Sequence, residues 1–552
     1  MLSRRDLLLL LGQGYVGARL APLTGMLASF APPKNSMRCI NVVNFIRAVE
    51  PRFKMDMMLS VRNQMELILK YRLSATWLLQ YDALVSGPFV GFLKERMAKD
   101  HEVGFWFEMN EMHVRASGVE WRGRPGYEWD YFPSVAFTLG YSKEDRVKLA
   151  DTAMREFKKV WGRYPSSVAS WNLDAFTIDH LVEHYDVDAF AVCRDQIATD
   201  GFTIWGAPIA GYYPSKTNCW SPALDRHNQI SAPVFRMLGQ DPVYYYDRVW
   251  RMPGKGGLTT PDTMEPVWPS GQSPTFVREF LDMIEKEPAL GFAYAQIGQE
   301  NSFPWDQQEP GYEPQMVALS KLRERGVVHV ETMGESGRRF KKAFKETPAQ
   351  AQVMPDDSFG NTDPSCASIW YQSRFYRANL HIKGGLPYLR DLTVYSDRMP
   401  QPHLDEPTRE NEVEQRMPAI LDGYHWRKPD SLAGGFFLTG DDRLRLTGKP
   451  EVKEDGASLE VRLPVQDGHV LRVRFDEQAL TASLDGGPLT LSFEWDPPKA
   501  ALKEVRGDKL LYGWHGLEYE ATVGTGTAEA TPSGCRIRSH DDPIRLRLAQ
   551  KS

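Results

Sequence analysis

The sequence predicts an α/β protein, a (β/α)7-8 barrel followed by a mainly antiparallel β-sandwich domain. Between about residues 38 and 335, short apolar segments alternate with amphipathic segments, which is typical of a parallel sheet covered by helices. After residue 345, apolar and polar residues alternate with period two and no long helical pattern appears. The 552 residues are also about twice what one domain needs, so at least two cores are expected.

The predicted barrel, residues 36–345, has eight candidate strands. Ser142 as an N-cap, Asp145 three residues later and apolar residues at helical spacing predict a helix over 142–161. Further helices are predicted over 177–184 and 274–287. An open, doubly wound sheet is the alternative, but no GxGxxG motif follows the first strand to indicate a dinucleotide site. The strands are predicted at 39–45, 75–81, 102–108, 168–172, 189–194, 234–238, 292–297 and 327–331.

The second half is predicted to begin with a linker. Residues 346–364 are rich in Pro, Ala, Gln, Asp and Gly, which favours an irregular connection. Residues 365–552 then contain alternating runs that start at Asn379, Leu392, Leu444, Leu459 and Leu471, with others at Leu489 and Ile544. Short alternating strands of this kind predict the β-sandwich domain.

The first 31 residues have the layout of a twin-arginine export signal. Arg4 and Arg5 precede five leucines, and small residues before position 31 offer a cleavage site. Arg19 interrupts the apolar run, so no permanent membrane span is expected. The sequence therefore predicts export through the twin-arginine translocase to the bacterial periplasm or the extracellular space. A basic amphipathic N-terminus of a cytoplasmic protein is the alternative.

Composition excludes several classes of partner. The net charge of −6 argues against a nucleic-acid binder that relies on a basic surface. Aromatic residues make up 11% of the chain, which suits either a flat, uncharged ligand such as a sugar or a well-filled core. The five cysteines are scattered and form no Cys/His cluster, which argues against a disulfide scaffold and a structural zinc site.

Polar residues follow nearly every predicted barrel strand, where the chemistry of such barrels is located. Loop ends are commonly polar, so the pattern gains weight only from its repetition around the barrel. Tryptophan faces stack on sugar rings, and arginine binds carboxylate or sulfate groups, although a loop folded on its own aromatics has the same composition. The predicted substrate-binding residues are Glu50, Arg52, Trp106, Trp121, Arg124, Trp129, Asn172, Arg194, Gln196 and Gln299.

Three short segments resemble polysaccharide deacetylases and the related barrel glycosidases. His101-Glu102-Val103-Gly104 is similar to their His-Glu-Ile-Gly segment. The stretch 161–165, followed by a strand and then residues 174–177, resembles their "G-x-x-P, strand, turn, helix" stretch, and 328–335 resembles their closing strand. In family 38 and family 57 glycosidases a β-sandwich lies behind the barrel. The resemblance implies a barrel of about 300 residues and activity on carbohydrates.

The metal ligands of the deacetylases are absent from the corresponding positions. Those enzymes use an aspartate on the first strand and an H-x-x-x-H pair after the third, and here the histidine positions hold Trp106 and Asn110. A metal-activated water would lack its ligands, so neither a metal nor another cofactor is predicted. The alternative is a metal-dependent deacetylase with an unusual ligand set of Glu108, Glu111 and His113.

The resemblance to family 57 implies a nucleophile after the fourth strand and an acid after the seventh. The matching positions are Asp174 and Glu300, and Glu108, Glu111 and Asp195 are the further catalytic candidates. Two carboxyl groups that flank a glycosidic bond are sufficient to cleave it. The first hypothesis is thus a metal-independent glycoside hydrolase for an oligo- or polysaccharide. After the metal-dependent deacetylase described above, a non-catalytic carbohydrate-binding protein on the same scaffold is the third hypothesis.

Overall fold

The computed structural model describes most of the chain after residue 35. The described ranges are 36–52, 54–193, 196–199, 202–204, 210–237, 263–354, 367–428, 430–540 and 542–550, with the backbone alone at 196–199 and 202–204. The predicted export signal, residues 1–31, lies outside these ranges. Within them, every helix is too short or too polar to cross a membrane.

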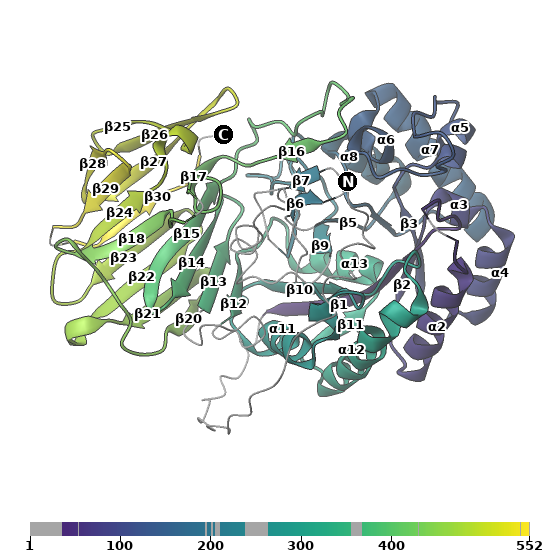
Figure 1. The fold of residues 1–552 in the computed structure, drawn as a ribbon, viewed down its shortest axis with the longest axis horizontal. Helices are drawn as coiled ribbons and strands as arrows, with labels where there is room; N and C mark the ends of the chain where they lie inside the picture. Colours follow the sequence, from purple (N-terminus) through teal and green to yellow (C-terminus); the bar gives the residue numbers. More distant parts are fainter. Residues whose placement is uncertain are drawn as a thin grey trace. The chain divides into compact units, whose positions relative to one another are not determined.

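All eight predicted barrel strands are present (Figure 1). They pair side by side in the order β10-β1-β2-β3-β4-β5-β9, all parallel, and β11 pairs with the first half of β1. A short antiparallel strand, β8 (Gly211–Tyr212), follows β9 at the end of this order. The predicted barrel is confirmed, with strands β1 (Met37–Ile46), β2 (Thr76–Leu79), β3 (Glu102–Trp106), β4 (Ser167–Ala169), β5 (Ala189–Cys193), β9 (Val234–Met237), β10 (Phe292–Ile297) and β11 (His329–Glu331).

The seam between β8, β9 and β10 is closed by side chains rather than by a continuous ladder. The ring of Phe235 on β9 stacks on that of Tyr294 on β10, with centroids 4.6 Å apart. Gln350 donates from Nε2 to the carbonyl oxygen of Gly211 at 2.6 Å, while its backbone forms a β-bridge with Leu290. Gln350 begins strand β12 (Gln350–Met354), so a strand lies inside the segment 346–364 that the sequence predicts as a linker.

Helices lie outside the barrel strands (Figure 1). The predicted helix over 142–161 is α7, where the Ser142 hydroxyl accepts the backbone N–H of Asp145 and Gly162 ends the helix at a φ of 74°. The other two predicted helices, α8 and α11, are also present. The barrel helices are α2 (Met57–Lys70), α3 (Tyr81–Leu84), α4 (Gly87–Arg96), α5 (Glu111–Ala116), α6 (Pro133–Ala136), α7 (Lys143–Trp161), α8 (Ala175–Tyr185), α10 (Pro269–Gln272), α11 (Pro274–Lys286), α12 (Trp305–Arg325) and α13 (Met333–Ala343).

The C-terminal part forms two antiparallel sheets, as predicted. Tyr371 of one sheet stacks on Phe475 of the other, with ring centroids 5.5 Å apart, and the Tyr376 hydroxyl donates to the carbonyl oxygen of Asp476. The ten-stranded sheet contains β12, β13 (Ala367–Gln372), β14 (Tyr376–Lys383), β15 (Leu386–Val394), β17 (Ala419–Asp422), β18 (Gly434–Thr439), β19 (Asp442–Arg443), β24 (Thr490–Glu494), β28 (Thr527–Thr531) and β29 (Gly534–Arg538). The eight-stranded sheet contains β20 (Glu451–Asp455), β21 (Ser458–Pro464), β22 (Val470–Asp476), β23 (Ala479–Leu484), β25 (Leu502–Arg506), β26 (Lys509–Trp514), β27 (Leu517–Thr525) and β30 (Ile544–Arg547).

A long connection between β15 and β17, residues 396–418, extends from the sandwich and is called the arm below. Its strand β16 (Val413–Gln415) pairs in parallel with β7 (Phe202–Ile204), which in turn pairs with β6 (Gln196–Thr199). Figure 1 shows β16 beside β6 and β7. The sequence pattern does not predict this three-stranded sheet, because it joins segments about 200 residues apart.

Candidate functional site

An arginine after β1 joins two glutamates from different strand ends. Arg47 donates from Nη2 to Oε2 of Glu108 and from Nη1 to Oε2 of Glu300, both at 2.5 Å. Glu108 follows β3 and Glu300 follows β10, so both lie at the carboxyl-terminal mouth of the barrel. The three side chains are at most 7% exposed. One guanidinium therefore holds two carboxyl groups within reach of a single substrate bond.

Hydrogen bonds to the backbone fix the loop that carries Arg47. Asn301 accepts the backbone N–H of Arg47 at 2.9 Å and donates from Nδ2 to its carbonyl oxygen at 2.8 Å. From the other side, the Asp82 carboxylate accepts the backbone N–H groups of Ala48 and Val49 at 2.9 and 3.1 Å. Arg47 therefore cannot move away from the two glutamates without breaking buried hydrogen bonds.

Gly298 lets the loop after β10 turn directly over the end of β1. Its φ is 138°, a backbone conformation that favours glycine, and a Cβ atom there would overlap the carbonyl oxygen of Val43. Glu300 lies two residues later, so the position of its carboxyl group depends on this close approach.

Gly298→Ala is expected to destabilise the protein by about 1–3 kcal/mol from the backbone conformation alone, and by more because of the overlap with Val43. Urea unfolding measures the change. The matched control is Gly326→Ala, which also has a positive φ, 74°, but no atom within 4 Å of the added Cβ. Equal losses of stability in the two variants would contradict the argument.

Three aromatic rings in mutual contact lie beside Glu108. The rings of Phe45 and Trp106 are parallel with centroids 3.9 Å apart, and Trp171 contacts both edge-on at 5.5 and 5.3 Å. Trp106 is fully buried and donates from Nε1 to Oε2 of Glu108 at 2.7 Å. Trp171 is half-buried. Trp106, predicted to bind substrate, thus supports Glu108 from beneath, and Trp171 offers the exposed surface.

The environment of Glu108 raises the pKa of its carboxyl group. Burial raises the pKa of Glu108, the charge of Glu300 adds to the rise, and Arg47 and the Trp106 N–H oppose it. Among the described residues, Oε1 of Glu108 and Oε1 of Glu300 have no hydrogen-bond partner, since Arg47 binds only the Oε2 atoms. Each carboxyl group therefore keeps one oxygen for a substrate.

The residues at the deacetylase metal positions do not fit a metal. Asn110 caps α5 by accepting the backbone N–H of His113. His113 is buried, bonded to the carbonyl oxygen of Leu149, and burial lowers its pKa to about 4. Glu111 pairs with Arg115 on the surface of α5. Glu108, Glu111 and His113 thus point to separate partners, and the part of the chain that the structure describes holds no group of three or more potential ligands.

Among the described residues, Asp174 forms no hydrogen bond or shared ion pair with the other candidate carboxyl groups. Asp174 is the N-cap of α8, where it accepts the backbone N–H of Thr177 at 2.9 Å and its hydroxyl at 2.7 Å. It also pairs with Arg146 at 3.1 Å, and both side chains are fully buried. Arg146 donates its remaining N–H groups to backbone carbonyls, including those of His403 and Leu404 in the arm. This geometry favours a structural role for Asp174.

Asp174→Asn is expected to destabilise the protein by about 3–5 kcal/mol, because Asn keeps the helix cap but leaves Arg146 buried without a counter-charge. Thermal and urea unfolding measure the loss, and the folded variant should keep its rate constant for substrate turnover. Asp145→Asn, which alters a solvent-exposed pair with Lys148, is the control and should change stability by less than about 1 kcal/mol. A stable but inactive Asp174→Asn variant would restore Asp174 as a catalytic candidate.

Other residues predicted to bind substrate lie around Arg47 and the end of β1. The Trp129 ring lies between Arg47 and Arg52, with guanidinium carbons 4.3 and 4.8 Å from its centroid, and Arg52 also pairs with Glu50. Gln299 donates its backbone N–H to Asn44 at 3.1 Å. These contacts make Glu50, Arg52 and Trp129 supports of Arg47.

The loop over 121–130 is folded on its own side chains. Arg124 forms two hydrogen bonds with Asp130, at 2.8 and 2.9 Å, and lies over the Tyr127 ring. The Trp121 ring covers Gly123. Trp121 and Arg124 therefore have partners within the loop. This arrangement agrees with the alternative to substrate binding given above, a loop folded on its own aromatic residues. Arg194 and Asp195 lie outside the described residues, as does the side chain of Gln196.

Sequence reasoning missed Gln415, a residue of the arm. Its Nε2 donates to Oδ1 of Asn172, 3.2 Å away, in the loop that follows β4. No sequence signal connects two amides 243 positions apart. Asn172, predicted to bind substrate, therefore lies at the barrel mouth together with a residue of the C-terminal part.

Comparisons with known proteins support the fold. No family model and no curated protein matches the sequence. Among solved structures, a candidate glycoside hydrolase/deacetylase from Parabacteroides distasonis is 16% identical with a TM-score of 0.53, over 72% of this chain and 95% of that one. A candidate polysaccharide deacetylase from Mycobacterium smegmatis is 12% identical with a TM-score of 0.33, over 58% of this chain and 96% of that one. The similarity to the first of these structures shows a shared fold.

Proposed function

We propose that this protein is a glycoside hydrolase that cleaves oligo- or polysaccharides with Glu108 and Glu300. The observation that carries the proposal is the pair of carboxyl groups held by Arg47 at the barrel mouth. A solved structure with the same barrel fold is described as a glycoside hydrolase/deacetylase, which agrees with this reaction class. Glu108 takes the place of Asp174 as the partner of Glu300.

The surroundings suggest different roles for the two glutamates. Glu108, whose pKa is raised by burial, is the general acid that protonates the leaving glycosidic oxygen. Glu300 then either attacks carbon 1 of the sugar or takes a proton from the attacking water. Arg47 orients both carboxyl groups, and the half-buried Trp171 ring provides a surface for stacking a sugar ring. No step requires a metal.

We further propose that the protein acts outside the cytoplasm. Arg4 and Arg5 before a leucine run support export through the twin-arginine translocase, and a polysaccharide substrate outside the cytoplasm would agree with it. Detection of the mature chain in a periplasmic or culture fraction, and its retention in the cytoplasm after Arg4 and Arg5 are replaced by Lys, would test this step.

A glycan panel tests the proposed reaction. The purified protein is incubated with acetylated and non-acetylated oligo- and polysaccharides, and both reducing ends and free acetate are measured, with and without EDTA. We expect new reducing ends, no acetate, and no effect of EDTA. Acetate release that EDTA abolishes would instead indicate a deacetylase. Binding of a glycan without any turnover would indicate a carbohydrate-binding protein.

A further inference from the structure

The arm is fastened to the barrel along much of its length. The side chain of Gln401 donates to the carbonyl oxygen of Leu173 at 2.7 Å and accepts the backbone N–H of Ala175 at 3.1 Å. Further along, Arg146 binds the carbonyl oxygens of His403 and Leu404, and β16 pairs with β7. The arm thus forms hydrogen bonds to the residues on both sides of Asp174, in the loop that connects β4 with α8.

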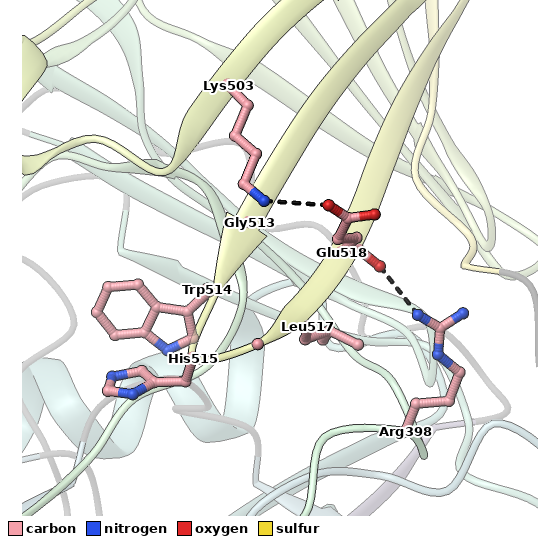
Figure 2. Close-up of a pocket in the computed structure, with 8 residues that line it drawn as sticks. Arg398, Lys503, Gly513, Trp514, His515, Leu517 and Glu518 are labelled. Atoms are coloured by element: carbon pink, nitrogen blue, oxygen red, sulfur yellow. Dashed lines mark hydrogen bonds and ion pairs between the residues drawn. The ribbon is translucent and has the colours of Figure 1, made fainter.

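The other side of the arm is fastened to the sandwich. Arg398 donates to the backbone oxygen of Glu518 at 3.0 Å, beside a cavity of about 510 Å³ at the β26–β27 hairpin (Figure 2). The guanidinium carbon of Arg416 lies 5.7 Å from the centroid of the Trp514 ring. Since the charges of Lys503 and Glu518 in this cavity pair with each other, we assign the cavity no ligand of its own. The arm is therefore held at fixed points on both parts of the chain.

The fixed arm places one amide side chain at the barrel mouth. Gln415 is 4% exposed and donates to Asn172, which is fully buried. Two atoms of this pair, Oε1 of Gln415 and Nδ2 of Asn172, are buried and have no partner among the described residues. An unpaired buried donor and an unpaired buried acceptor each carry a free-energy cost, which a ligand that bonds to them would remove.

The amide pair is connected to the catalytic group through Trp171 and Trp106. Asn172 directly follows Trp171, whose ring contacts that of Trp106, and Trp106 in turn donates to Glu108. The strands that carry these residues, β3 and β4, are neighbours in the barrel. A sugar stacked on Trp171 would therefore have its hydroxyl groups near the Gln415–Asn172 pair.

We propose that Gln415 and Asn172 form a two-amide subsite that binds hydroxyl groups of the substrate sugar, so that the arm completes the active site of the barrel. A free acceptor beside a free donor matches vicinal hydroxyl groups, each of which can both donate and accept. The inference rests on the proposed glycoside hydrolase activity and adds the C-terminal part of the chain to its substrate-binding site. Gln415 is a substrate-binding residue, and it takes no part in the chemical step.

Kinetics of single and double variants test the subsite. With any glycan that the wild type cleaves, Gln415→Ala should raise KM about three- to tenfold, as expected for the loss of a hydrogen bond to a neutral hydroxyl, and leave kcat within about twofold. Asn172→Ala should act similarly, and the double variant should raise KM by less than the product of the two single effects, because the two amides act as a unit. Glu414→Gln, an exposed neighbour on β16, is the control and should match the wild type.

The outcomes separate this inference from the proposed function. If the wild type cleaves glycans and Gln415→Ala has an unchanged KM, the subsite is wrong and the hydrolase proposal stands. A fall in kcat at constant KM, or a loss of melting temperature that accounts for the change, would also overturn the binding role. If the wild type neither cleaves nor binds any glycan of the panel, both proposals fail.

Discussion

Replacement of Glu108 or Glu300 by glutamine is expected to reduce the cleavage of natural glycans about 10²–10⁴-fold, because each change removes an acid–base or nucleophilic group. Glutamine keeps the size of the side chain and an oxygen for Arg47, so both variants should remain folded. Initial rates on the best glycan of the panel measure the effect. The expected loss is the same order for both variants on substrates whose leaving group needs a proton.

The two roles predict different responses to the leaving group and to pH. An activated aryl glycoside leaves without protonation, so Glu108→Gln should recover most of its rate on such a substrate while Glu300→Gln should not. Glu108 acts in its protonated form, so kcat/KM of the wild type should fall as the pH rises through its pKa. Because burial raises that pKa, the fall should occur at higher pH than for an exposed glutamate.

The rival glutamate provides the control. Glu111 is partly exposed and pairs with Arg115 four residues along α5, so Glu111→Gln should keep the wild-type rate. Rates of Glu108→Gln or Glu300→Gln above about a tenth of the wild-type rate on natural glycans would contradict the assignment. Equal losses in all three variants would point to a general defect in folding.

Arg47→Met is expected to lower the free energy of unfolding by about 3–5 kcal/mol and to abolish glycan cleavage. The change leaves two buried carboxyl groups, Glu108 and Glu300, facing each other without a counter-charge. Removal of the opposing effect of Arg47 should also raise the pKa of Glu108 further, since Arg47 lowers it in the wild type. Urea unfolding at neutral and at acidic pH measures both consequences.

The pH dependence follows from the sign of the shift. In the Arg47→Met variant the carboxyl group of Glu108 is stabilised in its protonated form, so the variant should be relatively more stable at acidic than at neutral pH. The Arg47→Lys variant has a positive charge at this position, but lysine cannot donate to both carboxyl groups in a fixed fork. The stability of this variant should therefore lie between that of the wild type and that of Arg47→Met. Arg115→Met, on the exposed pair of α5, should change stability by less than about 1 kcal/mol. An Arg47→Met variant as stable as this control would contradict the role of Arg47.

The strands could be predicted because their signals are local. Apolar β-prone runs located all eight barrel strands, whereas helix α12 contains Pro310 and Pro314, which ordinarily break helices, so its full length has no comparable local signal. The run that starts at Leu444 was wrongly predicted as a strand: β19 ends at Arg443, and within the run only Leu446 forms an isolated bridge, with Val465. Local patterns cannot show which segments pair when the partners are remote, as β16 and β7 are.

The site was predictable to the extent that strand ends define it. Glu108, Glu300 and Asn172 follow predicted strands, and the structure places all three at the barrel mouth. Asp174 also follows a strand, but an aspartate three residues before Thr177 at a helix start is equally an N-cap signal, and the cap is what forms. Gln415 could not be identified from its neighbours in the sequence, because its position depends on the folded arm.

The side chain of Gln350, which joins the seam at Gly211, has a consequence for the order of events during synthesis. The barrel strands end at Glu331, yet the seam needs a residue that leaves the ribosome later, and the arm with Gln415 follows later still. Domains of a growing chain generally fold from the N-terminus. The nascent barrel therefore lacks the contact between Gln350 and Gly211 until Gln350 has left the ribosome. Its mouth acquires the last amide only when about three quarters of the chain has been translated.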